Sequence, residues 1–118
     1  MEKFHDILKR KMDEFVHLVY HITKDFPKSE LYGSTSQIRR ASLSVILNYV
    51  EGYSRKRRLV KINFFEISYG SLQESKYLLG FALKEEWIKE IDCKKSLHLA
   101  EEIGAMLWRT IEGLSSDK

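Results

Sequence analysis

Hydrophobic residues recur at steps of three and four along the first part of the chain. Between positions 4 and 26 they are Phe4, Leu8, Met12, Phe15, Val19, Ile22 and Phe26, and most of the residues from Lys9 to Glu14 are charged. This period predicts an amphipathic helix over about 4–26 with one buried stripe. Pro27 predicts the end of the helix, because the residue before a proline is disfavoured in the α region.

A second helix is predicted over about 37–53, and it is apolar on more than one side. Its first edge consists of Ile38, Ala41, Val45, Tyr49 and Gly52, and its second of Leu43, Ile46, Leu47 and Val50. One side faces the core of a four-helix monomer, so the second apolar side predicts a subunit interface. The preceding stretch, 28–36, is expected to be a loop in which one hydroxyl of Ser34, Thr35 or Ser36 caps this helix.

Two further helices are predicted over about 59–84 and 89–113. The inner stripes are expected to be Ile62, Phe65, Tyr69, Leu72, Leu79 and Leu83 in the third helix, and Ile91, Leu99, Ile103, Met106, Leu107 and Ile111 in the fourth. Gly70 and Gly80 each cost about 1 kcal/mol in a helix interior relative to alanine, so we expect them to let a neighbouring helix approach closely. No alternating strand pattern competes. The chain is predicted to be an all-α, up-down-up-down four-helix bundle, with 1–118 as a single domain and a frayed end from Ser115.

Composition narrows the protein class only a little. The 118 residues fit one domain, and 43% hydrophobic with 31% charged residues is typical of a globular protein. No apolar run reaches the roughly 20 residues of a membrane span, and the first residues do not resemble a signal peptide. Cys93 is the one cysteine. We therefore expect a cytoplasmic protein without a membrane partner.

Charge is distributed unevenly. Residues 1–61 hold 13 Lys and Arg against 7 Asp and Glu, whereas residues 62–118 hold 7 against 10. Five cations, Arg55, Lys56, Arg57, Arg58 and Lys61, occupy seven positions at a predicted turn, with Tyr53 nearby. Such a cluster attracts phosphate backbones, and we interpret it as a candidate nucleic-acid-binding surface. The alternative is a solvated basic turn, or charge pairing between helices.

A row of polar residues interrupts the second helix. Gln37, Arg39, Arg40, Ser44, Asn48 and Glu51 belong to it, and Glu74 of the third helix is placed to join them. Polar atoms beside buried residues need hydrogen-bond partners, so a structural network that sets the bundle or subunit register is expected. The alternative is a polar site for an anionic ligand.

No residue pattern indicates catalysis. His17 and His21 have the spacing of a shared metal site, but the carboxylate-x-x-His partners of di-iron bundles are missing, so a surface pair is the preferred interpretation. Cys93 has no assignable base and is interpreted as structural. We predict no enzyme activity, no metal and no cofactor.

The motifs of the central region resemble a known family. They are Gln37-Ile38-Arg39-Arg40-Ala41, then Asn48 with Glu51-Gly52, and finally Gly70-Ser71-Leu72 with Glu74. In this order they resemble the four-helix-bundle proteins encoded in intervening sequences of bacterial 23S ribosomal RNA genes, with departures at Ser34 and Ile46. The resemblance implies a ring-shaped homopentamer. It also implies a relation to accessory proteins of diversity-generating retroelements, which work with a reverse transcriptase.

Taken with this resemblance, the basic turn predicts a non-enzymatic, oligomeric protein that binds RNA or DNA. The alternative is a protein-interaction adaptor or an accessory subunit of a reverse transcriptase.

Overall fold

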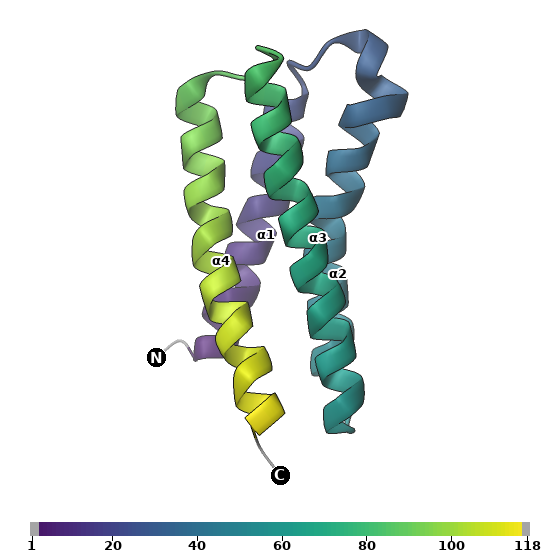
Figure 1. Ribbon diagram of the computed structural model, residues 1–118, viewed down its shortest axis with the longest axis vertical. Helices are drawn as coiled ribbons and strands as arrows, with labels where there is room; N and C mark the ends of the chain where they lie inside the picture. Colours follow the sequence, from purple (N-terminus) through teal and green to yellow (C-terminus); the bar gives the residue numbers. More distant parts are fainter. Residues whose placement is uncertain (1–2, 117–118) are drawn as a thin grey trace.

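The computed structural model describes residues 3–116 and consists of four long helices (Figure 1). They are α1 (Phe4–Thr23), α2 (Ser36–Tyr53), α3 (Arg58–Lys84) and α4 (Glu90–Ser116). Two short helical turns, η1 (Lys28–Glu30) and η2 (Leu31–Thr35), connect α1 to α2. No strand occurs within residues 3–116, and the predicted all-α class is confirmed.

Consecutive helices run antiparallel and lie side by side, and α4 returns to pack against α1 (Figure 1). The order around the bundle is therefore up-down-up-down, as predicted. α1 and α3 begin at the end of the bundle where α2 and α4 finish. The bundle measures 48 × 29 × 20 Å. Its elongated shape follows from helices of up to 27 residues, each rising about 1.5 Å per residue.

The core is formed by one stripe from each helix. Fully buried residues include Leu8 and Phe15 of α1, Val45 of α2, Leu72 of α3 and Leu107 of α4. The structure corrects the predicted stripe at Ile91, which is 71% exposed. Its near neighbour Cys93 is buried instead, because two residues along a helix turn the side chain by about 200°.

The α2 and α3 helices approach each other closely where small residues meet. The Ser68 hydroxyl donates to the backbone oxygen of Val45 at 2.6 Å, and the hydroxyls of Ser44 and Ser71 lie 2.8 Å apart. Near the end of α2, Gly52 is buried against α3.

The glycines predicted to permit close approach are the wrong ones within this chain. Gly70 and Gly80 have open space where a side chain would lie. A methyl group at Gly52, in contrast, would lie 2.7 Å from Cε1 of Phe65 and 2.9 Å from Cβ of Phe64. The rotation of each helix decides which glycine faces a neighbour, and Gly52 faces α3 most closely, whereas a methyl group at Gly104 of α4 would lie 3.4 Å from Cδ2 of Leu72.

The predicted end of the first helix is three residues too late. After Thr23 the backbone N–H groups of Lys24, Asp25 and Phe26 donate to carbonyls three residues earlier, at 3.1–3.3 Å. The final turn before Pro27 is thus tighter than an α-helix, as is common at helix ends. The predicted loop over 28–36 is also largely helical.

The predicted hydroxyl cap of the second helix is wrong. Thr35, which precedes α2, makes no side-chain capping bond. The Glu30 carboxylate instead accepts from the backbone N–H of Ser34 at 3.2 Å, one turn before α2 begins. The helical turns η1 and η2 lead directly into α2, and the backbone N–H of Ser36, its first residue, donates to Gly33 O in η2.

A single residue in the left-handed conformation ends α3. Glu86 has φ of 64°, its N–H donates to Leu83 O at 3.0 Å, and the N–H of Trp87 donates to Ala82 O at 2.9 Å. The Trp87 ring then packs between Phe26 and Phe81. α4 begins four residues after Glu86 and continues to Ser116, so Ser115 is helical rather than frayed.

Candidate nucleic-acid interface

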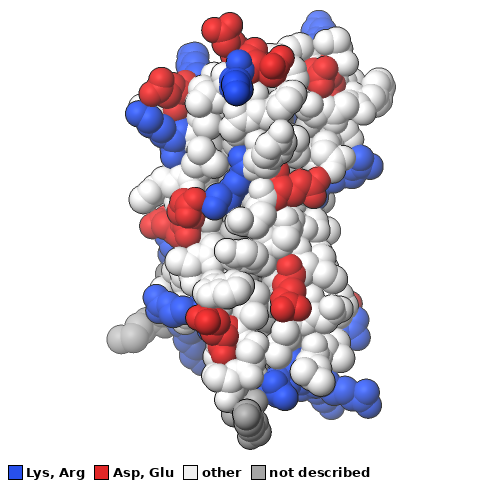
Figure 2. All heavy atoms as spheres, in the orientation of Figure 1, with Lys and Arg blue, Asp and Glu red and all other residues white. Residues whose placement is uncertain are grey.

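The basic turn joins α2 to α3 at the end of the bundle where α1 begins. Arg55, Lys56, Arg57 and Arg58 are all exposed, and Lys61 is partly buried. On the face shown in Figure 2, basic side chains gather at this end with few acidic ones beside them, whereas basic and acidic side chains are mixed over the middle and the opposite end. The fold therefore presents the five predicted cations together on one end of the molecule.

Three of these five cations already have partners within the chain. Arg55 pairs with Glu51 one turn earlier and lies over the Phe64 ring, 5.3 Å from its centre. Arg58 donates to Leu114 O at 3.0 Å, and Lys61 donates to Tyr53 O at 2.9 Å. These two carbonyls belong to the last turns of α4 and α2, where backbone oxygens lack helical partners and carry partial negative charge. Arg58 and Lys61 thus stabilise two helix ends.

Lys56 and Arg57 are the two cations left over. Both are exposed, and the side chain of neither has an ion pair or hydrogen bond to another residue in the range 3–116. An exposed cation without an internal partner can neutralise a phosphate at no cost to existing contacts, whereas Arg55 must share its charge with Glu51. The sequence pattern did not distinguish the five cations from one another. In the structure, three of them have internal partners, and the side chains of Lys56 and Arg57 have none among residues 3–116.

An aromatic pocket, which the residue pattern did not predict, includes Tyr53 and Lys61 from the two sides of the basic turn. It has a volume of about 400 Å³ and is lined by side chains from all four helices. Aromatic rings make up most of the lining, and two lysines also belong to it. The lining residues are Lys3, Phe4, His5, Tyr49, Tyr53, Lys61, Phe65, Thr110 and Leu114. The signal that could have revealed it is the position of Phe4, His5 and Tyr53 at helix ends that meet in an up-down bundle.

The rings in this pocket are stacked and hydrogen-bonded. His5 stacks on Tyr53 with 3.5 Å between ring centres, and its Nδ1 lies 2.8 Å from the hydroxyl of Tyr49. Burial lowers the pKa of His5, so its ring is neutral at pH 7, and the nearby Asp6 opposes this effect only in part. Burial also raises the pKa of Tyr49, which keeps its phenol protonated. The pocket wall is therefore uncharged apart from its lysines.

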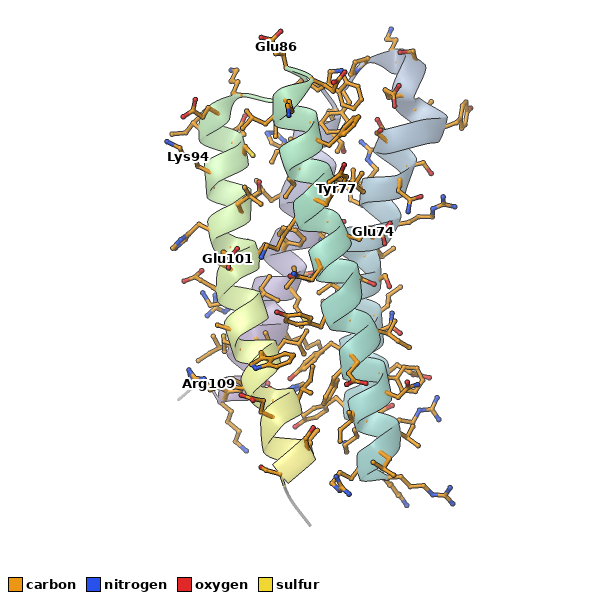
Figure 3. The ribbon with its side chains drawn as sticks, viewed as in Figure 1. Glu74, Tyr77, Glu86, Lys94, Glu101 and Arg109 are labelled. Carbon is orange, nitrogen blue, oxygen red and sulfur yellow. The ribbon has the colours of Figure 1, made fainter. Side chains whose placement is uncertain are left out.

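The polar row of α2 is divided into separate groups. Gln37 donates to Glu74 of α3 and accepts from Arg40 at 3.4 Å. One turn further, the Asn48 amide donates to Ser44, whose hydroxyl meets Ser71 of α3. Figure 3 shows Glu74 on the side of α3 that faces α2.

The remaining two members of the row bind elsewhere. Arg39 reaches α1, where its Nε donates to the Thr23 hydroxyl at 2.8 Å and its guanidinium lies over the Tyr20 ring. Glu51, in the last turn of α2, forms an ion pair with Arg55 of the following basic turn. The contacts of Gln37, Arg39 and Ser44 join α2 to a neighbouring helix, whereas those of Arg40, Asn48 and Glu51 stay within α2 and the turn after it.

The second apolar side of α2 lies at the surface. Leu43, Leu47 and Val50 follow one another at steps of four and three, and Leu47 is 58% exposed. Beside them, Ile46 and Tyr20 line a shallow groove of about 270 Å³ between α1 and α2. We call Leu43, Leu47 and Val50 the α2 stripe.

The other residues considered for chemistry are structural or exposed. Cys93 is buried with its thiol 3.7 Å from Leu79 O, and burial raises its pKa. His17 is exposed and lies 3.4 Å from the Asp13 carboxylate. Within residues 3–116, no three His, Cys, Asp or Glu side chains converge as metal ligands. No helix in that range is long and apolar enough to cross a bilayer.

Comparison with known proteins agrees with this architecture. The sequence matches the family model described as 23S rRNA-intervening sequence protein over residues 6–109. No curated protein matches the chain. A crystal structure of a protein of unknown function from the S23 ribosomal protein family of Bacteroides thetaiotaomicron superposes with a TM-score of 0.80 at 22% identity. The alignment covers 88% of this chain and 97% of that one, so the two share their fold.

Proposed function

The chain belongs to the family of 23S rRNA-intervening sequence proteins, and on that premise we propose that it is a non-enzymatic, oligomeric protein that binds RNA or DNA through its basic turn. The observation that carries the proposal is the pair Lys56 and Arg57, whose side chains are exposed and have no partner within residues 3–116. Arg55, Arg58 and Lys61 surround this pair and raise the local positive potential. Phosphate groups are the anions that such a surface attracts.

Filter binding of a structured RNA across a salt series tests the basic turn. Each lost phosphate contact lowers the slope of log affinity against log salt by about 0.7–0.9. The double variant Lys56→Gln with Arg57→Gln is therefore expected to weaken binding at low salt and reduce the slope by about 1.4–1.8. Because these side chains make no hydrogen bond or ion pair among the described residues, the helix content of the variant should match that of the parent.

A matched control removes the same charge from the other half of the bundle. Lys28 and Lys95 are exposed and lie away from the basic turn. The variant Lys28→Gln with Lys95→Gln should keep most of the affinity and the full salt slope. Equal effects of both double variants would reduce the proposal to a net-charge effect, and no binding by the parent at low salt would refute it.

The α2 stripe supports assembly through a second copy of the chain. Leu43, Leu47 and Val50 form a continuous apolar row on a helix that already supplies its other side to the core. Such a row on a soluble bundle is typical of a protein contact. We assign it to the homo-oligomer, and the five-subunit ring implied by the family resemblance is the arrangement we propose. A ring would repeat the basic turn around one axis and multiply its contacts with a polyanion.

Light scattering after size exclusion tests the assembly. Five copies of the 14.0 kDa chain have a mass of about 70 kDa. Leu47→Glu should lower the measured mass without loss of helix content, whereas Ile91→Glu, at an isolated exposed position on α4, should leave it unchanged. A parent protein that elutes as a monomer would refute assembly through the stripe.

The same stripe favours a second candidate function, an adaptor or accessory subunit of a reverse transcriptase. The discriminating measurement is complex formation with a purified reverse transcriptase at high salt, where phosphate contacts are screened. Three results together would replace the first proposal by this one. The complex persists at high salt, Leu47→Glu abolishes it, and the parent protein is a monomer that binds no nucleic acid.

A further inference from the structure

The aromatic pocket is lined by residues on both sides of Lys56 and Arg57 in the sequence, whereas these two cations line a separate hollow with Arg55 and Val60. Tyr53, which ends α2, lines the pocket, and Lys56 and Arg57 follow it in the basic turn. Lys61 connects the two features, because it lines the pocket, donates to Tyr53 O, and lies 5.5 Å from the centre of the Tyr53 ring. A ligand that occupied both features would therefore carry an aromatic group and a negative charge a short distance apart.

The chemistry of the pocket wall matches such a ligand. Phe4 is 42% exposed and Tyr53 is 51% exposed, and His5 already covers one face of the Tyr53 ring, so an incoming base would stack on Phe4 or extend the His5–Tyr53 stack. The guanidinium of Arg109, labelled on α4 in Figure 3, lies 5.8 Å from the centre of the Phe4 ring and adds a further cation at the rim. Among the described residues that line the pocket none is acidic. Its volume of about 400 Å³ is within the range of small-ligand sites.

Resting on the proposed function, we infer that this pocket receives an unpaired base of a single-stranded nucleic acid whose phosphates lie on Lys56 and Arg57. Proteins that bind single strands combine a positive track for the backbone with aromatic rings on which bases stack. In a duplex the bases are paired and stacked on one another, so a base enters a pocket only at a cost of a few kcal/mol for unpairing and unstacking it. The pocket therefore gives the basic turn a preference for single-stranded segments, which the cations alone do not supply.

Fluorescence anisotropy with a labelled single-stranded RNA and its perfect duplex tests this inference. The parent should bind the single strand more tightly than the duplex. Loss of one base stack on an aromatic side chain corresponds to about a five- to hundredfold loss of affinity. Tyr53→Leu and Phe4→Leu should each weaken single-strand binding within that range, with little change in duplex binding and no change in the salt slope.

Two control variants separate the pocket from the basic turn. Tyr77→Leu makes the same substitution at a 70% exposed tyrosine in the other half of α3 (Figure 3) and should leave affinity unchanged. Lys56→Gln with Arg57→Gln should weaken both RNAs and reduce the salt slope, while the preference for the single strand remains. Circular dichroism of every variant confirms that its helices are intact.

The outcomes distinguish failure of this inference from failure of the proposed function. If Tyr53→Leu and Phe4→Leu bind the single strand as the parent does, the pocket inference is overturned, although the basic turn still binds phosphate. A free nucleoside, which carries no phosphate, that binds as tightly as the strand would also overturn it, since the phosphates on Lys56 and Arg57 would then contribute nothing. If the parent binds neither RNA at low salt, the proposed function fails first.

Discussion

Gly52 offers the sharpest test of how α2 and α3 pack. The substitution Gly52→Ala adds one methyl group at a buried position, 2.7 Å from Cε1 of Phe65 and 2.9 Å from Cβ of Phe64. The Phe65 ring cannot simply turn away, because it is buried and stacked on Tyr49 with 5.2 Å between ring centres. The Cβ atom of Phe64 is attached to the backbone of α3, so relief at that contact requires the helix itself to move.

Two effects of opposite sign determine the magnitude. Alanine is better than glycine in a helix by up to about 1 kcal/mol, and this gain is smaller near a helix end such as that of α2. Overpacking a filled core costs about 1–3 kcal/mol. We therefore expect Gly52→Ala to lower the free energy of unfolding by about 1–2 kcal/mol and the melting temperature by about 3–8 °C.

Gly70→Ala is the matched control, because it adds the same methyl group to the middle of α3 where the space is open. It should raise the free energy of unfolding by about 0.5–1 kcal/mol. Urea unfolding followed by circular dichroism and by tryptophan fluorescence gives both values if the two transitions coincide. A Gly52→Ala protein as stable as the parent or more stable would refute the close approach.

A double-mutant cycle identifies the neighbour that resists the methyl group. Phe65→Leu removes part of the ring that the methyl group would meet. In that background Gly52→Ala should cost less, with a coupling energy of about 0.5 kcal/mol or more. Simple additivity would assign the cost to Phe64 and the backbone of α3 instead.

Three further predictions concern other parts of the bundle. Glu86→Gly should raise the free energy of unfolding by about 0.5–1 kcal/mol in urea titrations, because Glu86 has φ of 64° and glycine adopts that conformation without strain; a loss of stability would contradict this. Since burial lowers the pKa of His5, the unfolded chain binds its proton first, so stability should fall as the pH drops from 7 towards 5. His5→Gln, which retains a hydrogen-bonding group for Tyr49, should show a shallower fall over that range, and parallel curves would argue against the His5 contribution. The buried Cys93 thiol should react slowly with a disulfide reagent in the folded protein and rapidly in urea, whereas rapid reaction without urea would contradict its burial.

Helix number and order were predictable because they depend on local patterns. A 3.6-residue period, one proline and short polar connections suffice to define four segments and their antiparallel order. The errors lie at the ends, where the chain is not periodic. Tight backbone bonds before Pro27 and the helical turns η1 and η2 depend on local hydrogen bonds that residue types do not specify uniquely.

The aromatic pocket shows what local patterns miss. Its rings come from positions 4, 5, 49, 53 and 65, and each of these residues fits an ordinary helix stripe or helix end when considered alone. They share a pocket because α1 and α3 begin where α2 and α4 finish. The sequence indicated which residues were aromatic, and only the packing of four helices showed which of them meet.

By itself, the sequence determined the bundle, the basic turn and the excess of apolar surface on the second helix, because each is a property of neighbouring residues. The tertiary structure decided which cations of the basic turn have partners within the chain. Arg58 binds a carbonyl 56 positions away in α4 and Lys61 binds the end of α2, which leaves the side chains of Lys56 and Arg57 free of internal partners among the described residues. It also decided that Gly52, rather than Gly70 or Gly80, meets another helix. Both decisions depend on the rotation of each helix and on the helix end it meets, and no local pattern carries that information.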